Sequence, residues 1–292
     1  FNANNKVGET WSFQTNSATG STEDITLGGI STMLYDMGIG ESYFKGNPGF
    51  ANYQIYSGGT TGVKTITLRG KKNVFADITS VILNTGFAYG YLDFTGWDGL
   101  TSINLLNSPE LSGVTFPVLD SVDVFSVSSC DIQGNLDLTN LTNLGGLFWS
   151  HFNSNLTGIT HTASTQAFTF YRAYSNDLTG THDVSMLSGL GGQFDIAQNS
   201  NLTEIINPTS TTVFSKYECV GCDLRHLDVS GLSSLGGNFE ANSNSNLTAI
   251  THGSSSQSFT NYNASSCDIT GEHDVRMLSN LGGTFKMTLN PG

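Results

Sequence analysis

The stretch LGGLFWSHFNSNLTGI, residues Leu144 to Ile159, recurs along the chain. It returns as LGGQFDIAQNSNLTEI from Leu190, as LGGNFEANSNSNLTAI from Leu235 and as LGGTFKMTLN from Leu281. A second block alternates with it and ends in Asn or Cys, then Asp and an aliphatic residue. Its copies read VFSVSSCDIQG, FYRAYSNDLTG, KYECVGCDLRH and NYNASSCDITG. Self-similarity of this kind indicates a repeat architecture.

Aligning both blocks on their shared Asn or Cys gives one such position, here called the ladder position, every 22 or 23 residues. The ladder residues are Gly86, Ser108, Cys130, Asn153, Asn176, Asn199, Cys222, Asn244, Cys267 and Asn290. The chain resembles the leucine-rich repeat, whose pattern L-x-x-L-x-L-x-x-N/C-x-L is visible at Val122, Phe125, Val127, Cys130 and Ile132. The resemblance implies a mainly β solenoid of about ten coils over residues 72–292, with a parallel sheet on its concave face.

Large apolar side chains precede the ladder by five positions and predict an aromatic spine inside the solenoid. They are Val81, Ile103, Phe125, Phe148, Tyr171, Phe194, Tyr217, Phe239, Tyr262 and Phe285. Three positions before the ladder, small residues leave room for these rings. They are Ser150, Ala173, Ala241 and Ala264. We expect the ladder Asn to be buried and to bond to the backbone of the turn, and the first coils, at Gly86 and Ser108, to be less regular.

Residues 1–71 do not follow the ladder. The segments TWSFQT, EDITL, YQIYS and VKTITLRG predict short antiparallel strands and a small β-sandwich. The stretch from Tyr35 to Gly70 resembles PKD-type immunoglobulin-like domains, although Ile39 replaces the usual Asp. The resemblance implies a module that caps the first coil. At the other end the sequence stops within a coil, which predicts a partner contact or chain continuation there; the alternative is a fraying last coil.

The composition limits the classes of partner. The formal net charge of −13 argues against a nucleic-acid partner. The sequence contains no run of 18 apolar residues, so we predict no insertion into a membrane. Only 12% of the residues are charged, so Ser, Thr, Asn and Gly carry the polarity. The chain begins at Phe1 without Met or a basic and apolar leader, which suggests a processed or partial product.

Catalytic and metal sites are not indicated. Three of the four Cys fall on the ladder, where Cys replaces Asn as a small buried group. Cys219, Cys222 and His226 lack the second pair that a zinc site needs, so no metal or cofactor is predicted. Five of the six His recur with the repeat and are expected on turns or on the convex side. No nucleophile elbow, P-loop or paired carboxylates occur, so we predict that the protein is not an enzyme.

The outward positions of the strands single out one candidate ligand-binding surface. Most coils carry small polar residues there, whereas two neighbouring coils carry large ones and the next coils carry charges. The candidate residues are Leu147, Trp149, His151, Phe170, Arg172, Tyr174, Asp195, Lys216, Glu218 and Glu240. Trp, Tyr and Arg are the residue types that anchor interfaces. A covering loop, or a register shifted by one residue, is the alternative.

These observations favour a non-catalytic extracellular recognition or adhesion protein that binds a protein or a glycan through the concave face. The richness in Ser, Thr, Asn and Gly resembles bacterial surface adhesins and phage receptor-binding or tail-fibre proteins, which implies a location on a cell or virion surface. The alternative is a structural subunit that buries the aromatic surface and its C-terminal end in a larger assembly.

Overall fold

The structure is a computed structural model of the chain, and it describes residues 9–17, 22–28, 33–36, 41–44, 50–56, 62–70, 78–83, 88–270 and 273–290. These residues form strands, turns and irregular segments, with no helix among them. Contacts between residues divide the chain into two compact units, residues 1–132 and 133–292.

The first unit has eleven strands among its described residues. They are β1 (Glu9–Ser17), β2 (Thr22–Gly28), β3 (Met33–Asp36), β4 (Glu41–Phe44), β5 (Phe50–Tyr56), β6 (Gly62–Gly70), β7 (Ser80–Leu83), β8 (Tyr89–Asp93), β9 (Ser102–Asn104), β10 (Glu110–Thr115) and β11 (Val122–Ser126). One sheet follows the order β10-β8-β1-β6-β3-β4, and the unit's other strands follow the order β11-β9-β7-β2-β5.

The N-terminal strands of this unit pair antiparallel, as the sequence predicts. Strand β1 pairs with β6 and strand β2 with β5 over their whole lengths. Strand β2 also pairs antiparallel with β7, and β1 meets β8 at Gln14 and Tyr89. Both strands of the first coil therefore have a hydrogen-bonded neighbour on this side, as an edge strand requires. The predicted boundary at residue 71 and the turn at Ile39 lie outside the described residues.

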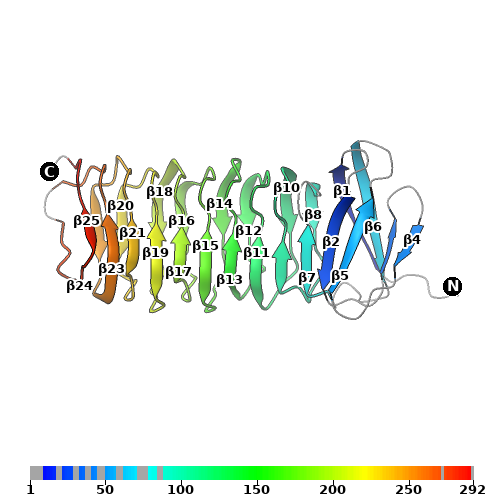
Figure 1. Ribbon diagram of the computed structural model, residues 1–292, viewed down its shortest axis with the longest axis horizontal. Coiled ribbons are helices and arrows are strands. Elements are labelled where there is room, and N and C mark those ends of the chain that lie inside the picture. The colour runs from blue at the N-terminus through cyan, green and yellow to red at the C-terminus, as the bar shows by residue number, and fades with distance from the viewer. Residues whose placement is uncertain are drawn as a thin grey trace. The chain divides into compact units, whose positions relative to one another are not determined.

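The second unit has fourteen strands among its described residues. They are β12 (Gly134–Asp137), β13 (Leu144–Trp149), β14 (Leu156–Thr160), β15 (Phe168–Arg172), β16 (Thr179–Asp183), β17 (Gly192–Asp195), β18 (Asn201–Ile206), β19 (Phe214–Glu218), β20 (His226–Val229), β21 (Gly237–Glu240), β22 (Ala249–His252), β23 (Ser255–Asn263), β24 (Leu278–Asn280) and β25 (Thr284–Lys286). Strands β13, β15, β17, β19, β21, β23 and β25 lie side by side in parallel and form what we call the front sheet (Figure 1).

Each coil of this unit returns through a second strand, here called a back strand. The back strands pair in parallel twos, β12 with β14, β16 with β18 and β20 with β22. Counted over both units, the parallel β-solenoid has about nine coils of about 23 residues, against the ten that the ladder predicts. The predicted ladder residue Gly86 lies outside the described residues.

The predicted aromatic spine is confirmed. Every member from Val81 to Tyr262 is fully buried, whereas Phe285 is 46% exposed. In the second unit the six successive ring pairs from Phe148 to Phe285 are stacked, with centroids 4.6 to 5.7 Å apart. The small residues predicted beside the rings are also buried. Stacked pairs contribute about 0.5–1.5 kcal/mol beyond the burial of their area, so the spine joins coil to coil through side chains as well as backbone.

The ladder is confirmed as a buried hydrogen-bonding column. The Asn199 amide nitrogen donates to the carbonyls of Ile196 in its own coil, at 2.7 Å, and of Ala173 in the preceding coil, at 2.9 Å. Its carbonyl oxygen accepts from the Leu178 N–H at 3.2 Å. The Cys222 thiol keeps the contact to the preceding coil, since it donates to the Ile196 carbonyl of that coil at 3.4 Å. Cys therefore replaces Asn as the sequence predicts, with fewer bonds.

The residue before the ladder has a left-handed backbone in every described coil. These residues are Asn107, Ser129, Phe152, Ser175, Gln198, Gly221, Ser243, Ser266 and Leu289, with φ between 53° and 65°. Gly and Asn adopt this conformation readily, whereas it is unusual for other residues and most of all for a bulky side chain. The repeat sequence alone does not single out this position, because residues as different as Gly, Gln and Phe occupy it.

The recurrent His lie on back strands and in the turns beside them, and the sequence does not predict that four of these side chains point inward. Nε2 of His161 and of His182 each lie 2.8 Å from the hydroxyl oxygen of the spine residue Tyr171. His252 and His273 flank Tyr262 in the same way. The buried tyrosine hydroxyl needs polar partners, and imidazoles from the back strands and the turns beside them supply these partners from both sides.

The His–Tyr–His arrangement fixes the protons. A tyrosine hydroxyl has one proton, so it donates to one imidazole and accepts from the N–H of the other, and the two rings hold opposite tautomers. Burial lowers the pKa of His161 to about 3 and that of His182 to about 4, so both rings are neutral near pH 7. Tyr217, the spine tyrosine between Tyr171 and Tyr262, instead donates to Asn207 at 3.0 Å.

Candidate functional site

The front sheet arranges its outward side chains in rows that cross the strands. The first row contains Leu147, Phe170, Gln193, Lys216, Asn238 and Asn261. The second row contains Trp149, Arg172, Asp195, Glu218, Glu240 and Asn263. Two positions further along the chain, His151, Tyr174 and Ala197 begin a third row. Neighbours within a row are about 4.8 Å apart, the spacing of paired strands.

All ten candidate residues face outward and are half-buried, and none is in the buried core. The predicted register is therefore correct. Leu147 and Phe170 are cross-strand neighbours in the first row, as are Trp149 and Arg172 in the second. Because side chains in such pairs lie on one face of the sheet, these four form a continuous surface.

The Arg172 guanidinium joins the aromatic residues of the first two rows. It lies 4.5 Å from the Phe170 ring centroid and 5.8 Å from that of Trp149. Its Nη2 donates to the Gln193 side-chain oxygen at 3.0 Å. A guanidinium over an aromatic face contributes about 0.5–1 kcal/mol at exposed sites. Arg172 is thus held in one orientation and still presents further N–H donors.

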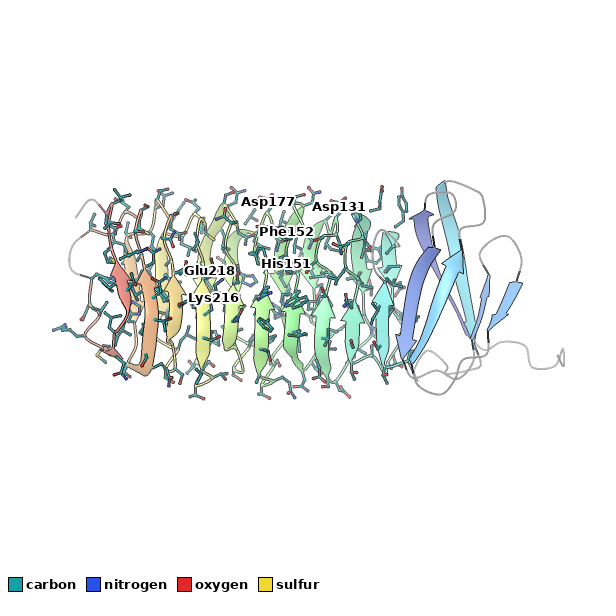
Figure 2. All side chains as sticks on the ribbon, in the orientation of Figure 1. Asp131, His151, Phe152, Asp177, Lys216 and Glu218 are labelled. Carbon is teal, nitrogen blue, oxygen red and sulfur yellow. The ribbon has the colours of Figure 1, made fainter. Side chains whose placement is uncertain are left out.

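Three more rings extend this surface into the turn after the strands. His151 stacks on Tyr174 with centroids 4.5 Å apart and planes 9° from parallel. Phe152 packs edge-on against both, with ring centroids 5.2 Å away. Figure 2 labels His151 and Phe152 in the turn after β13. Burial, and secondarily the charge of Arg172, lowers the pKa of His151 to about 4, so the stacked imidazole is neutral near pH 7. We call Trp149, His151, Phe152, Phe170 and Tyr174 the aromatic cluster.

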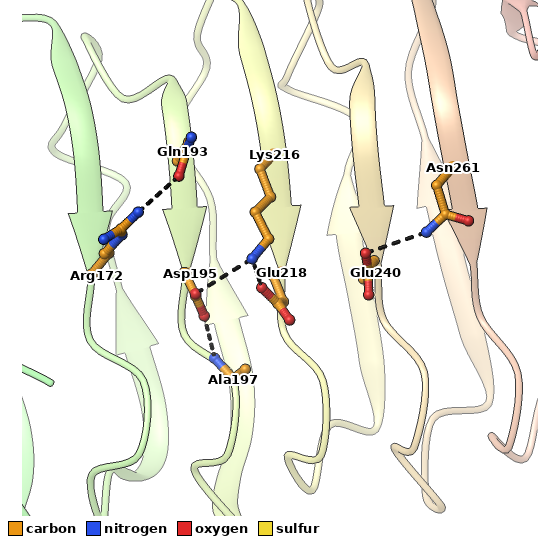
Figure 3. A network of polar contacts seen from close by, with 8 residues as sticks. All are labelled: Arg172, Gln193, Asp195, Ala197, Lys216, Glu218, Glu240 and Asn261. Carbon is orange, nitrogen blue, oxygen red and sulfur yellow. Dashed lines mark hydrogen bonds and ion pairs between the residues drawn. The ribbon is translucent and has the colours of Figure 1, made fainter. Parts of the chain in front are cut away.

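The charged candidates form a second group on the next three strands. The Lys216 ammonium pairs with Glu218 and lies 3.7 Å from the Asp195 carboxylate (Figure 3). Burial and the nearby Glu218 carboxylate raise the pKa of Asp195 to about 6. Burial alone would lower the pKa of Lys216, but Glu218 and Asp195 raise it. The structure joins these three residues into one network, called the charged cluster.

Glu240 lies on the next strand beside this network, as the cross-strand neighbour of Glu218. Its Oε1 accepts a hydrogen bond from Asn261 at 3.3 Å (Figure 3). Three residues of the surface are missed by reasoning from the sequence: Phe152, Gln193 and Asn261. Phe152 was missed because its exposure depends on the left-handed turn. Gln193 and Asn261 could have been found, since they occupy the outward position two before Asp195 and Asn263.

The thiols are placed where they react poorly. All four Cys are free and buried. Burial raises the pKa of Cys130 to about 12 and that of Cys222 to about 11. His226 is exposed on back strand β20, whereas Cys219 and Cys222 are buried, so the three do not converge. Among the described residues, no group of three or more His, Cys, Asp or Glu could hold a metal ion.

A separate groove of about 260 Å³ lies at the back strands β18 and β20. Its lining residues are Thr203, Glu204, Ile205, Arg225, His226 and Asp228. Glu204 accepts a bond from Thr181, and Asp228 caps the turn at Ser230. The two carboxylates therefore have structural partners of their own, and the groove lacks the ring cluster that marks the front sheet.

No protein-family profile, curated protein or solved structure matches the chain. The described part of the chain contains no helix with the length and apolar character that a membrane crossing requires. The geometry of the front sheet is therefore the basis for a functional assignment.

Proposed function

We propose that the protein is a non-catalytic recognition protein that binds a macromolecular ligand, a protein or a glycan, through the front sheet. The observation that carries this proposal is the aromatic cluster, whose rings stand on the front strands and on the turns that follow them and, like the Arg172 guanidinium, keep part of their surface exposed. Aromatic and Arg side chains surrounded by polar residues are the composition of binding hot spots. The hydrogen-bonded ladder beneath the rows holds them in place.

The proposal includes the finer assignments made from the sequence. The solenoid is of the leucine-rich-repeat type with the front sheet on its concave face, supported by the Asn and Cys ladder and by the period of about 23 residues. The N-terminal strands are a PKD-like cap, supported by their antiparallel pairing and by their hydrogen bonds to both strands of the first coil. The low charge fits an extracellular adhesin or a phage tail-fibre component, acting at a cell or virion surface.

The test is binding of the labelled protein to a panel of bacterial cell envelopes. The double variant Trp149→Ala/Tyr174→Ala should weaken attachment at least about thirtyfold, or about 2 kcal/mol. Its thermal transition should be nearly unchanged, because both side chains point outward. Arg225→Gln, exposed at the back strands, is the matched control and should bind like the wild type. Undiminished attachment of the double variant would reject the site and favour a structural role in an assembly.

A further inference from the structure

The third row contains a sharp step in side-chain size. Tyr174 stacks on His151 with one ring face. The next residue of the row is Ala197, and the Ser175 N–H donates to the Ala197 carbonyl at 2.9 Å, which keeps the two coils in register. A methyl group cannot cover an aromatic ring. The Tyr174 face that points away from His151 is therefore free of any stacking partner from its own row.

Polar groups held by bonds of their own occupy the first and second rows of the neighbouring coils. Asp195 occupies the second row of the Ala197 coil, where its Oδ1 accepts the Ala197 N–H at 3.2 Å. Its other oxygen faces the Lys216 ammonium, which also pairs with Glu218 (Figure 3). In the coil of Tyr174 itself, Arg172 is the cross-strand partner of Asp195 and is held by Phe170 and Gln193. A ring face next to oriented acceptors and donors matches a sugar, whose C–H face is apolar and whose hydroxyls both donate and accept.

The charges around the ring favour a neutral sugar. Two cations, Arg172 and Lys216, balance the two carboxylates of Asp195 and Glu218, and Glu240 adds a further negative charge. The chain as a whole carries −13, so its field disfavours the approach of an acidic polymer. A sulfated or uronic-acid chain would be repelled both by the excess carboxylate at this surface and by the net charge of the protein, whereas a neutral chain is repelled by neither.

The length of the surface favours a chain over a single sugar. The two clusters and Glu240 span the five front strands β13, β15, β17, β19 and β21. Four strand spacings amount to about 19 Å across the sheet. One sugar can contact Tyr174 and Asp195, but only an extended ligand can reach from Trp149 to Glu240.

We propose that the front sheet binds a neutral oligosaccharide that crosses the strands, with one sugar stacked on Tyr174 and hydroxyls bound by Asp195, Lys216 and Arg172. This inference rests on the proposed recognition function and names its ligand class.

The experiment screens the wild-type protein against an array of neutral, sulfated and uronic-acid oligosaccharides, followed by calorimetric titration with the neutral probes that bind. Neutral probes should be retained in preference to acidic ones, and affinity should rise with probe length up to about four or five sugars, one for each spacing of the surface. Tyr174→Ala and the isosteric Asp195→Asn should each raise the Kd at least about tenfold. Arg225→Gln should leave the Kd unchanged.

Two results would overturn the inference. One is retention of acidic probes alone, or of none. The other is an unchanged Kd in Tyr174→Ala and Asp195→Asn, with circular dichroism establishing that both variants are folded. If cell envelopes still bind the protein through Trp149 and Tyr174 while protease, and not periodate, abolishes their binding, the recognition function stands and its ligand is a protein.

Discussion

Phe152 has a backbone conformation that its side chain does not favour. Its φ is 59°, and its side chain is 52% exposed. The left-handed region costs an ordinary residue roughly 1–2 kcal/mol, and most other coils use Asn, Ser or Gly here. Burial of the ring offsets little of this conformational cost, because about half of the residue faces water. Strain that is kept at an exposed ring of the aromatic cluster is what the proposed binding role predicts.

Replacing Phe152 with Asn should separate these two effects. Asn tolerates the left-handed turn, so the free energy of unfolding should stay the same or rise by up to about 1 kcal/mol, as measured by urea denaturation. Attachment to the ligand should weaken, because the ring that packs on His151 and Tyr174 is lost. Ser175→Asn, at the same position of the next coil, is the control. A loss of more than 1 kcal/mol in stability would show that the ring is structural.

In every described coil whose ladder residue is Asn, the buried amide donates to a backbone carbonyl three residues before it. At Asn199 four backbone groups from two coils bond to one buried side-chain amide. Asn199→Ala leaves these groups unpaired in the interior and should lower the free energy of unfolding by at least about 2 kcal/mol in urea. Asn199→Cys should cost less, because the thiol at Cys222 makes the equivalent bond to the preceding coil. Equal losses in the two variants would contradict this account.

The sequence was sufficient for the front strands and for the side of the front sheet that each residue faces, because both follow from a period repeated many times. It did not predict the back strands. The inward position of Phe194, for example, follows from the same alignment that identifies the equivalent inward residues two coils away, and the structure confirms it. It was not sufficient for contacts that depend on the turns. The bond from His161 to Tyr171 joins residues ten apart, and nothing in the spacing shows that the turn directs the imidazole inward.

At the scale of the whole molecule, the buried imidazoles couple stability to pH. Burial lowers the pKa of His151, His182 and His252 to about 4 and that of His161 to about 3, against an ordinary value of 6.5. Between about pH 4 and 6.5 the unfolded chain binds more protons than the native one, so the free energy of unfolding falls as the pH falls. Asp195, with its pKa raised to about 6, acts in the opposite direction and offsets part of this slope.

The repeat itself supplies the variants that test this coupling. In the coil of Tyr217, Asn207 and Leu227 occupy the places of His161 and His182. His161→Asn/His182→Leu should therefore fold and should reduce the slope of unfolding free energy by about 1.4 kcal/mol per pH unit for each histidine removed. The reciprocal variant Asn207→His/Leu227→His should steepen it. Urea denaturation from pH 4 to 7 measures all three slopes, and parallel curves would show that these imidazoles do not govern acid stability.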